Sequence, residues 1–270
     1  MTHVTHDSSP APGVDNGPSP PEPLLAVRQL VKRFTLHAVD GRTVVGLDGV
    51  DLDVGHREHV ALAGLSGAGK SSLLKCVHRT YVAESGSIRY RTETGSMVDL
   101  LALPDGELAD LREREIGYVS QFLRAEPRRG VLDVVARAAQ RMGADEEEAR
   151  DRAAQVLRQL NIGESLWATY PTLLSGGEKQ RVNLAAGIVV APRLLLLDEP
   201  VSALDPANRQ AVLDVIAELT ARGATVLSVF HDLDAMAQLA DRIVVLIDGH
   251  IIDDGPAADI LERGVALVAN

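Results

Sequence analysis

The chain has 270 residues, a hydrophobic content of 46% and a formal net charge of −11. This length accommodates one large α/β domain or two small ones, and the apolar fraction can fill a sizeable core. The acidic balance argues against nucleic-acid binding through phosphate contacts, and the single cysteine, Cys76, excludes a disulfide framework and fits a reducing, cytoplasmic compartment.

The N-terminal segment 1–23 is rich in Pro, Ser, Gly and Asp, and it lacks the basic start and apolar centre of a signal peptide. We expect it to be a disordered tail. The longest apolar stretch, near 187–197, is interrupted by Pro192 and Arg193. No run approaches the roughly 20 residues that a spanning helix needs, so we expect no direct membrane insertion.

Residues 24–54 alternate apolar and polar positions, which is typical of strands with one buried face. Asp40 and Gly41 form a hairpin signal between two of the runs, and the segment therefore predicts an antiparallel β layer. Phe34 is either a half-buried strand aromatic or a stacking partner for a base. The predicted strand runs are 24–30, 43–47 and 50–54.

The next segment combines a buried strand at 60–63 with a phosphate-binding loop at 64–71, which fits G-x-x-x-x-G-K-[ST]. Its glycines let backbone N–H groups turn inward around phosphates, Lys70 adds a charge for the β/γ-phosphates, and the Ser71 hydroxyl can bind Mg²⁺. A helix over 70–78 would direct its positive end at the same anion. The predicted phosphate-binding residues are Gly64, Leu65, Ser66, Gly67, Ala68, Gly69, Lys70, Ser71 and Ser72.

Between this loop and the second motif we expect a small strand pair at 88–90 and 97–100, a charged helix at 105–114 and a strand at 116–119. Helical periodicity then covers 131–141 and 144–160, with Trp167 and Tyr170 packed inside. This part of the chain predicts a helical subdomain inserted into the sheet domain.

The stretch 174–181 reads Leu-Ser-Gly-Gly-Glu-Lys-Gln-Arg and begins a helix that extends to about Val190. Ser175, Gly176 and Gly177 at the start of this helix offer one hydroxyl, free backbone N–H groups and a helix dipole. They predict a second anion-binding site.

An apolar strand at 194–197 ends in Asp198 and Glu199. Asp198 can hold Mg²⁺ through water, and Glu199 can polarise the attacking water in a phosphoryl transfer. The remaining elements alternate between helix and strand, and no internal repeat is present. They are a helix at 206–222, a strand at 225–230, a helix at 233–240, strands at 242–247 and 250–253, and a short helix at 257–266.

Occurring in this order, the motifs resemble those of the ATP-binding-cassette (ABC) ATPases, over roughly residues 24–253. The resemblance implies an α/β, P-loop NTPase fold: a mixed sheet flanked by helices, with an antiparallel β layer and an inserted helical subdomain. On this basis we expect a disordered tail at 1–23, an ATP-binding domain at 24–256 with its helical subdomain at about 125–185, and a C-terminal short helix and tail at 257–270.

The resemblance also implies roles for single residues, with ATP and Mg²⁺ as cofactors. Glu199, His231 and Gln121 match catalytic positions, and Ser71, Gln121 and Asp198 match metal-binding ones. Phe34, Asp205 and residues 175–177 match positions that contact nucleotide, in addition to the phosphate loop. The family works as a head-to-tail dimer with ATP between the loop of one subunit and the 174–180 signature of the other; the second subunit could be another copy or a paralogous cassette.

Residues outside these motifs resemble the ATP-binding L subunit of the bacterial carbon–phosphorus lyase system. The matching stretches are Phe34 to His37, Ile116 to Arg124, Leu132 to Val135, Glu164 to Trp167 and Phe230 to Asp232. This resemblance implies a cytoplasmic ATPase attached to the carbon–phosphorus lyase core subunits, at the step that forms α-D-ribose 1-methylphosphonate 5-triphosphate.

Some positions depart from the family pattern without removing a catalytic group, so we expect hydrolytic competence. They are Ser72, Val201, Arg57 and the tail 1–23. The main alternative is the ATPase subunit of a membrane transporter. A non-transport cassette acting on DNA or ribosomes is disfavoured by the acidic charge, and an unrelated phosphate-loop kinase is disfavoured by residues 175–177.

Overall fold

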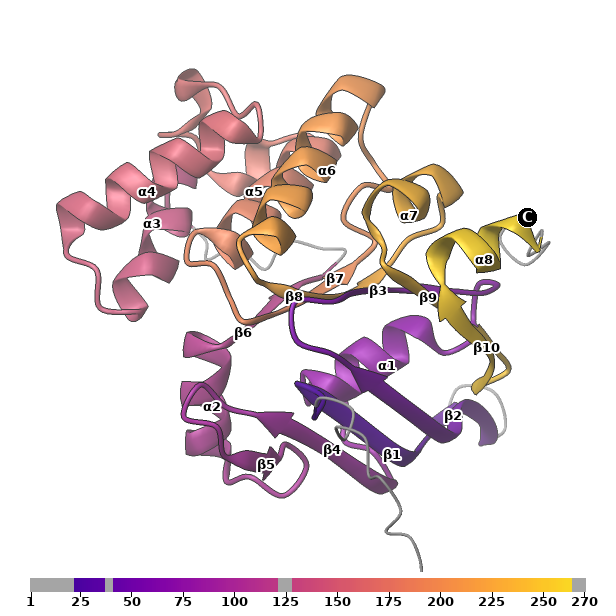
Figure 1. Cartoon of the computed structure of the whole chain (residues 1–270). Helices are drawn as coiled ribbons and strands as arrows, with labels where there is room; N and C mark the ends of the chain where they lie inside the picture. The colour runs from indigo at the N-terminus through magenta and orange to yellow at the C-terminus, as the bar shows by residue number, and fades with distance from the viewer. Residues whose placement is uncertain (1–21, 37–40, 121–127, 264–270) are drawn as a thin grey trace, which may run out of the picture.

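The computed structural model describes residues 22–36, 41–120 and 128–263. Two sheets stack with a helix between them (Figure 1). The smaller sheet is antiparallel and has the strand order β2-β1-β4-β5, which confirms the expected antiparallel layer. Its strands are β1 (Leu25–Leu36), β2 (Arg42–Val54), β4 (Ser85–Arg91) and β5 (Met97–Asp99).

The larger sheet has six strands in the order β10-β9-β3-β8-β7-β6. Neighbouring strands are parallel except at the β9–β10 edge, so the sheet is mixed, as expected. The strands are β3 (His59–Ala63), β6 (Ile116–Val119), β7 (Leu194–Asp198), β8 (Thr225–Val229), β9 (Arg242–Ile247) and β10 (His250–Pro256).

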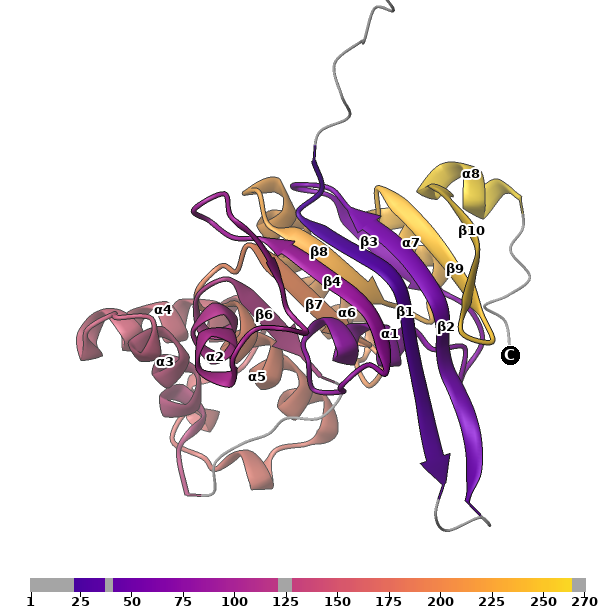
Figure 2. The ribbon, with the colours of Figure 1, turned by 90° about the horizontal axis from the view of Figure 1, so that it is seen from below.

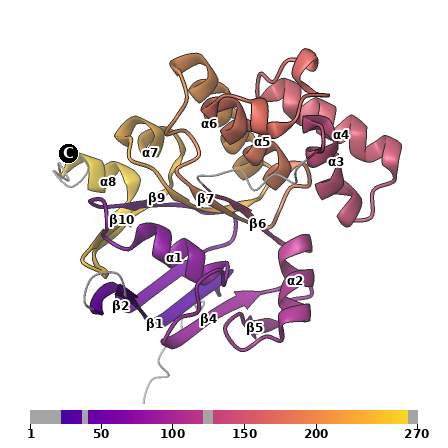
Figure 3. The same cartoon turned by 180° about the vertical axis from the view of Figure 1, so that it is seen from behind.

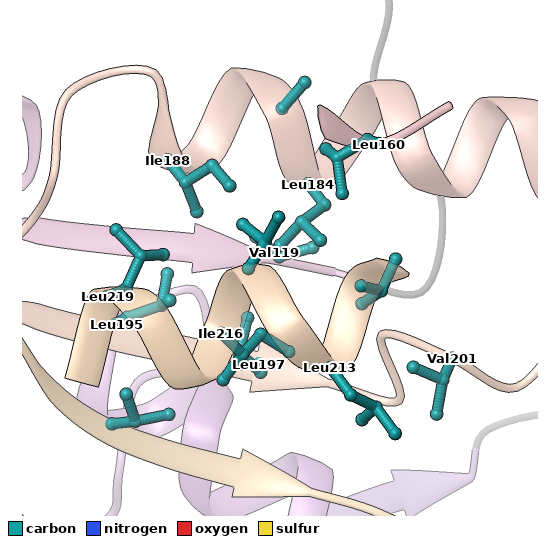
Figure 4. Close-up of a cluster of buried hydrophobic side chains, with 14 of the residues drawn as sticks. Val119, Leu160, Leu184, Ile188, Leu195, Leu197, Val201, Leu213, Ile216 and Leu219 are labelled. Carbon is teal, nitrogen blue, oxygen red and sulfur yellow. The ribbon is translucent and has the colours of Figure 1, made fainter. Parts of the chain in front are cut away.

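Both faces of the larger sheet are covered, which explains why its inner strands β7 and β8 are buried along their whole length. Along β7, Leu194 and Leu196 face the smaller sheet and α1 (Lys70–Val77), whereas Leu195 and Leu197 face the helices on the other side. Figure 4 shows that second cluster, where α6 and α5 pack over β7 and β6. The helices of that side are α5 (Gly176–Ile188), α6 (Pro206–Ala221), α7 (Leu233–Leu239) and α8 (Ala257–Glu262).

Helices α3 (Val131–Arg141), α4 (Glu146–Gln159) and α5 gather at one end of the molecule, beyond β6 (Figure 3). Asp145 caps α4 by accepting a hydrogen bond from the Glu148 backbone N–H at 2.9 Å, so the acidic run after it serves a helix start. Helix α2 (Asp105–Arg114) lies on the opposite side of β6, beside the smaller sheet. Within the described residues, no helix has both the length and the apolar character that crossing a membrane requires.

Several sequence expectations differ from the structure. The runs at 24–54 belong to two long strands, β1 and β2, rather than three short ones (Figure 2). Irregular register between β1 and β2 interrupts the apolar alternation without ending either strand. Tyr170 is 47% exposed and does not pack inside.

Cys76 is fully buried, as a small apolar side chain would be. The expected disordered tail lies outside the described residues, apart from Glu22 and Pro23.

The buried polar residue His59 begins β3 and has 0% exposure. Its ring Nε2 lies 2.8 Å from the Ser228 hydroxyl, and its ring packs near Phe230. Burial lowers the pKa of His59 from 6.5 to about 4 because the charged imidazolium would lose its hydration. His59 is therefore neutral in the folded chain at neutral pH.

We predict that His59 makes the fold sensitive to acid. Above pH 6.5 the ring is neutral in both states; as the pH falls towards 4, the unfolded chain gains a proton that the folded chain excludes. Because a pKa unit corresponds to about 1.4 kcal/mol, this lowers the free energy of unfolding by about 3 kcal/mol. Urea unfolding of wild type and His59→Gln across this pH range should show the smaller loss in the variant, and parallel curves would contradict the prediction.

Candidate nucleotide-binding site

The loop between β3 and α1 has the backbone that phosphate binding needs. Gly64 and Gly69 have φ angles of 136° and 107°, which side chains disfavour. A Cβ at Gly64 would lie 2.1 Å from the Leu246 carbonyl oxygen, and one at Gly69 would lie 2.2 Å from the Gly46 carbonyl oxygen. The loop is thus held against β9 on one side and β2 on the other, with the first N–H groups of α1 unpaired within the helix.

Lys70 is the first residue of α1 and reaches back along this loop. Its Nζ donates to the carbonyl oxygens of Gly64 at 2.6 Å and Leu65 at 2.9 Å. Burial lowers the pKa of Lys70, while the nearby carboxylates of Glu199 and Asp198 oppose that shift. Because an ammonium has three N–H donors, one remains for a phosphate oxygen.

The carboxylate of Asp198, at the end of β7, is 5% exposed. It accepts hydrogen bonds from the Ser71 hydroxyl at 2.6 Å and from the Tyr118 hydroxyl at 3.3 Å, and the Lys75 Nζ lies 3.8 Å away. A hydroxyl and a carboxylate at this distance are oxygen donors of the kind that Mg²⁺ prefers when phosphates and water complete its shell. These residues therefore fit Mg²⁺.

Glu199 follows directly and has an unusual backbone, with φ of 55°. Its side chain is 20% exposed, and its Oε1 lies 2.7 Å from the Nε2 of His231, the second residue after β8. A carboxylate held beside an imidazole at the mouth of a phosphate loop can orient and deprotonate a water molecule.

The structure brings half of the predicted residues into one cavity of about 140 Å³. The cavity contains the phosphate loop from Ser66 onward, together with Glu199 and His231 from two other strand ends. Its lining residues are Ser66, Gly67, Ala68, Gly69, Lys70, Ser71, Ser72, Glu199 and His231.

The 175–177 segment lies outside this cavity. Ser175 caps α5: its Oγ accepts from the Glu178 N–H at 3.3 Å, and the Glu178 carboxylate accepts from the Ser175 N–H at 2.7 Å. That hydrogen bond lowers the pKa of Glu178. The N–H groups of Gly176 and Gly177 remain outside the capping box, so an anion can bind here.

The other predicted residues have different surroundings. The Asp205 side chain caps α6, accepting from the Asn208 N–H at 3.1 Å, which lowers the pKa of Asp205. Phe34 is half-buried, with its ring edge-to-face against Tyr81 at 5.2 Å between centroids. Gln121 falls outside the described residues.

Two contacts at the site involve residues for which the sequence analysis predicts no role of their own. The Tyr118 hydroxyl donates to the Asp198 carboxylate, although the two residues are 80 positions apart in the chain. Gln180 donates from Nε2 to the Glu199 carbonyl oxygen at 2.6 Å. Neither contact has a local sequence signal, because both depend on how distant elements pack.

The family follows from comparison with known proteins. Residues 47–202 match the family model described as "ABC transporter". The match covers the phosphate loop, the α5 signature and the β7 carboxylates, and the chain therefore belongs to the ABC transporter family of ATP-binding cassettes.

The curated relatives are methionine import ATP-binding proteins, named MetN. The protein of Thermobifida fusca is 34% identical over 244 residues, which are 89% of this chain and 74% of that protein. The protein of Rhizobium etli is 34% identical over 87% of this chain. The chain spans 63% of the Rhizobium etli protein and 65% of that of Xanthomonas oryzae, less than two thirds of either.

These relatives overturn the expected assignment to carbon–phosphorus lyase. They are named as methionine import ATP-binding proteins, so the predicted lyase function and the predicted lyase core partners are both wrong. The transporter alternative fits the relatives better. Residues outside the nucleotide-binding motifs do not indicate the partner of the cassette reliably, because many of them are needed for packing.

Solved cassettes have the same fold. A dimeric ATP-binding cassette in a post-hydrolysis state with ADP and Pi superposes with a TM-score of 0.78 at 26% identity, covering 86% of this chain and 98% of that one. The cbiO1 protein of Clostridium perfringens, part of the ABC transporter complex cbiONQ, gives 0.70 at 27% identity and covers 90% and 92% of the two chains.

We predict that Tyr118→Phe weakens metal-dependent ATP binding, because a hydrogen bond to a metal-binding carboxylate orients it. Loss of such a partner typically costs on the order of tenfold in metal affinity. The measurement is the ratio of ATP Kd values with Mg²⁺ and with EDTA, in a Glu199→Gln background that prevents turnover. The exposed Tyr170→Phe is the control. An unchanged ratio in Tyr118→Phe would count against this role.

Proposed function

We propose that this chain is the ATP-hydrolysing subunit of a membrane transporter and that it works as a head-to-tail dimer. The observation that carries the ATPase assignment is the convergence of Lys70, Asp198, Glu199 and His231 on the phosphate loop. The transport assignment is supported by the family and by the import function named for the curated relatives.

In this proposal each side chain has a distinct task at the γ-phosphate. The loop N–H groups and Lys70 bind the phosphate oxygens, while Ser71 and Asp198 hold Mg²⁺, which supplies charge neutralisation when bound. Glu199 accepts the proton of the attacking water, and His231 holds the Glu199 carboxylate in place and faces the same phosphate.

The dimer is supported by the separation of the two anion sites within one chain. Residues 175–177 lie outside the cavity that holds the phosphate loop, so they do not complete their own chain's site. A second cassette placed head-to-tail would bring its 175–177 segment to the open side of the triphosphate. The related cassette with ADP and Pi is itself dimeric.

A groove between α2 and helices α3 and α5 is suited to a transporter partner. It has a volume of about 470 Å³, and Tyr118 lies in its wall. Among the described residues that line it, Arg112, Arg114 and Arg141 are basic and Glu113, which pairs with Arg141 at 3.7 Å, is acidic. This excess of positive charge favours an acidic cytosolic segment of the membrane subunit.

We predict that Glu199→Gln retains ATP binding but loses turnover, because a carboxamide cannot accept the proton of water. The kcat should fall at least about 100-fold, with the ATP Kd within about twofold of wild type. Phosphate release and equilibrium binding measure the two quantities. Glu164→Gln, at an exposed glutamate that pairs with Arg158, is the control. Substantial turnover by Glu199→Gln would refute its role as base.

The same variant tests the dimer. With ATP bound and hydrolysis blocked, Glu199→Gln should elute as a dimer in size-exclusion chromatography. Adding Ser175→Arg should return it to a monomer that still binds ATP, because the added side chain blocks the partner's nucleotide. An ATP-dependent dimer that persists with Ser175→Arg would contradict the head-to-tail arrangement.

We predict that Arg141→Glu releases the chain from membranes, because it reverses a charge in the groove. In the native host, the fraction that sediments with membranes and is recovered with an integral membrane protein should fall about tenfold, and uptake of labelled methionine should fall with it. Arg150→Glu, on α4 outside the groove, is the matched control. Recovery in complexes without any membrane protein would contradict the transporter assignment.

A further inference from the structure

Gln180 is a buried polar residue of α5 that the ATPase mechanism above does not use. It is 4% exposed. It lies five positions after Ser175, which caps the same helix, and five residues correspond to about 7.5 Å of helix rise. Gln180 therefore belongs to the rigid element whose N-terminus carries the second anion site.

Both ends of the Gln180 amide are bonded to the segment that follows β7. The Nε2 donates to the Glu199 carbonyl oxygen at 2.6 Å, and the Oε1 accepts from the Ala203 N–H at 3.2 Å. The Nε2 also lies 3.5 Å from the Ser202 hydroxyl. One side chain thus fixes the backbone on both sides of the turn that leads from Glu199 to α6.

This attachment falls where the backbone needs support. Glu199 has φ of 55°, a left-handed conformation that is unfavourable for a residue with a side chain and persists only when its surroundings hold it. The Glu199 N–H donates to the Val229 carbonyl oxygen at 3.1 Å, and its carbonyl accepts from Gln180. Since the backbone direction sets where the carboxylate points, Gln180 influences the position of Glu199 without touching substrate.

We propose that Gln180 is a positioning residue that links the two ATP sites of the dimer through one chain. The inference rests on the proposed head-to-tail dimer. Within a chain, Glu199 serves the nucleotide on its own phosphate loop, whereas Ser175 serves the nucleotide on the partner's loop. Movement of α5 when that second nucleotide binds is transmitted by Gln180 to the Glu199 backbone.

The first test is Gln180→Met, which keeps the length of the side chain and removes both hydrogen bonds. The kcat should fall about tenfold, as expected for the loss of one orienting hydrogen bond, and the ATP Kd should stay within about twofold. The Hill coefficient of hydrolysis for ATP should fall from near 2 towards 1. Gln155→Met, the same change on the exposed face of α4, should alter none of these quantities.

The variant Gln180→Glu should have a kcat that depends on pH, which a role of Gln180 in packing alone would not produce. At high pH the introduced carboxylate repels the Glu199 carbonyl oxygen. When it is protonated, the carboxyl group can donate a hydrogen bond to that oxygen as the amide does. The kcat of Gln180→Glu relative to wild type should therefore rise several-fold as the pH is lowered from 8 to 6. A pH-independent ratio would overturn the proposed hydrogen-bonding role.

Coupling between the two ATP sites would be contradicted by a Hill coefficient of 1 for wild type. It would also be contradicted if Gln180→Met left the Hill coefficient unchanged. Failure of the proposed function is recognised by other results: wild type that does not hydrolyse Mg²⁺-ATP, or Glu199→Gln that does. Thermal unfolding of each variant, expected within a few degrees of wild type, distinguishes a positioning role from loss of folded protein.

Discussion

The parallel pairing of β3, β8 and β7 is the constraint on which the site depends. Val229 of β8 lies opposite Leu62 of β3 and also opposite Asp198 of β7, so the three strands end at one level. The residues that follow these strands therefore emerge together at the carboxyl edge of the sheet, where ligands of open α/β sheets bind. At this edge the Ser71 hydroxyl donates to the Asp198 carboxylate at 2.6 Å, although the two residues are 127 positions apart in the chain.

This constraint explains which parts of the site could be predicted from the sequence. The glycines of the loop, Asp198, Glu199 and His231 all stand directly after apolar runs, and any parallel arrangement of those runs brings them together. Gln180 and Tyr118 act through contacts between elements far apart in the chain, which depend on helix placement. The lengths of β1 and β2 could not be predicted either, because their irregular register hides the alternation that marks a strand.

Partner choice was the least predictable property, and the positions that suggested carbon–phosphorus lyase show why. Val135 belongs to α3 and is fully buried. The Trp167 indole N–H donates to the Ile162 carbonyl oxygen at 3.1 Å, and its ring lies 5.0 Å from the Arg158 guanidinium. These side chains stabilise the helical end of the cassette, so their identity reports packing. Residues 121–124 and His37, from the same resemblance, lie outside the described part of the chain.

Cys76 has a practical consequence for following this molecule in motion. It is the only cysteine of the chain, it is fully buried in α1, and burial raises the pKa of its thiol to about 11. The reactive thiolate is therefore scarce at neutral pH and shielded from reagents. A cysteine introduced at any exposed position would be the single labelled site, so fluorescent or spin probes could measure movements between α5 and the sheet without first removing a native thiol.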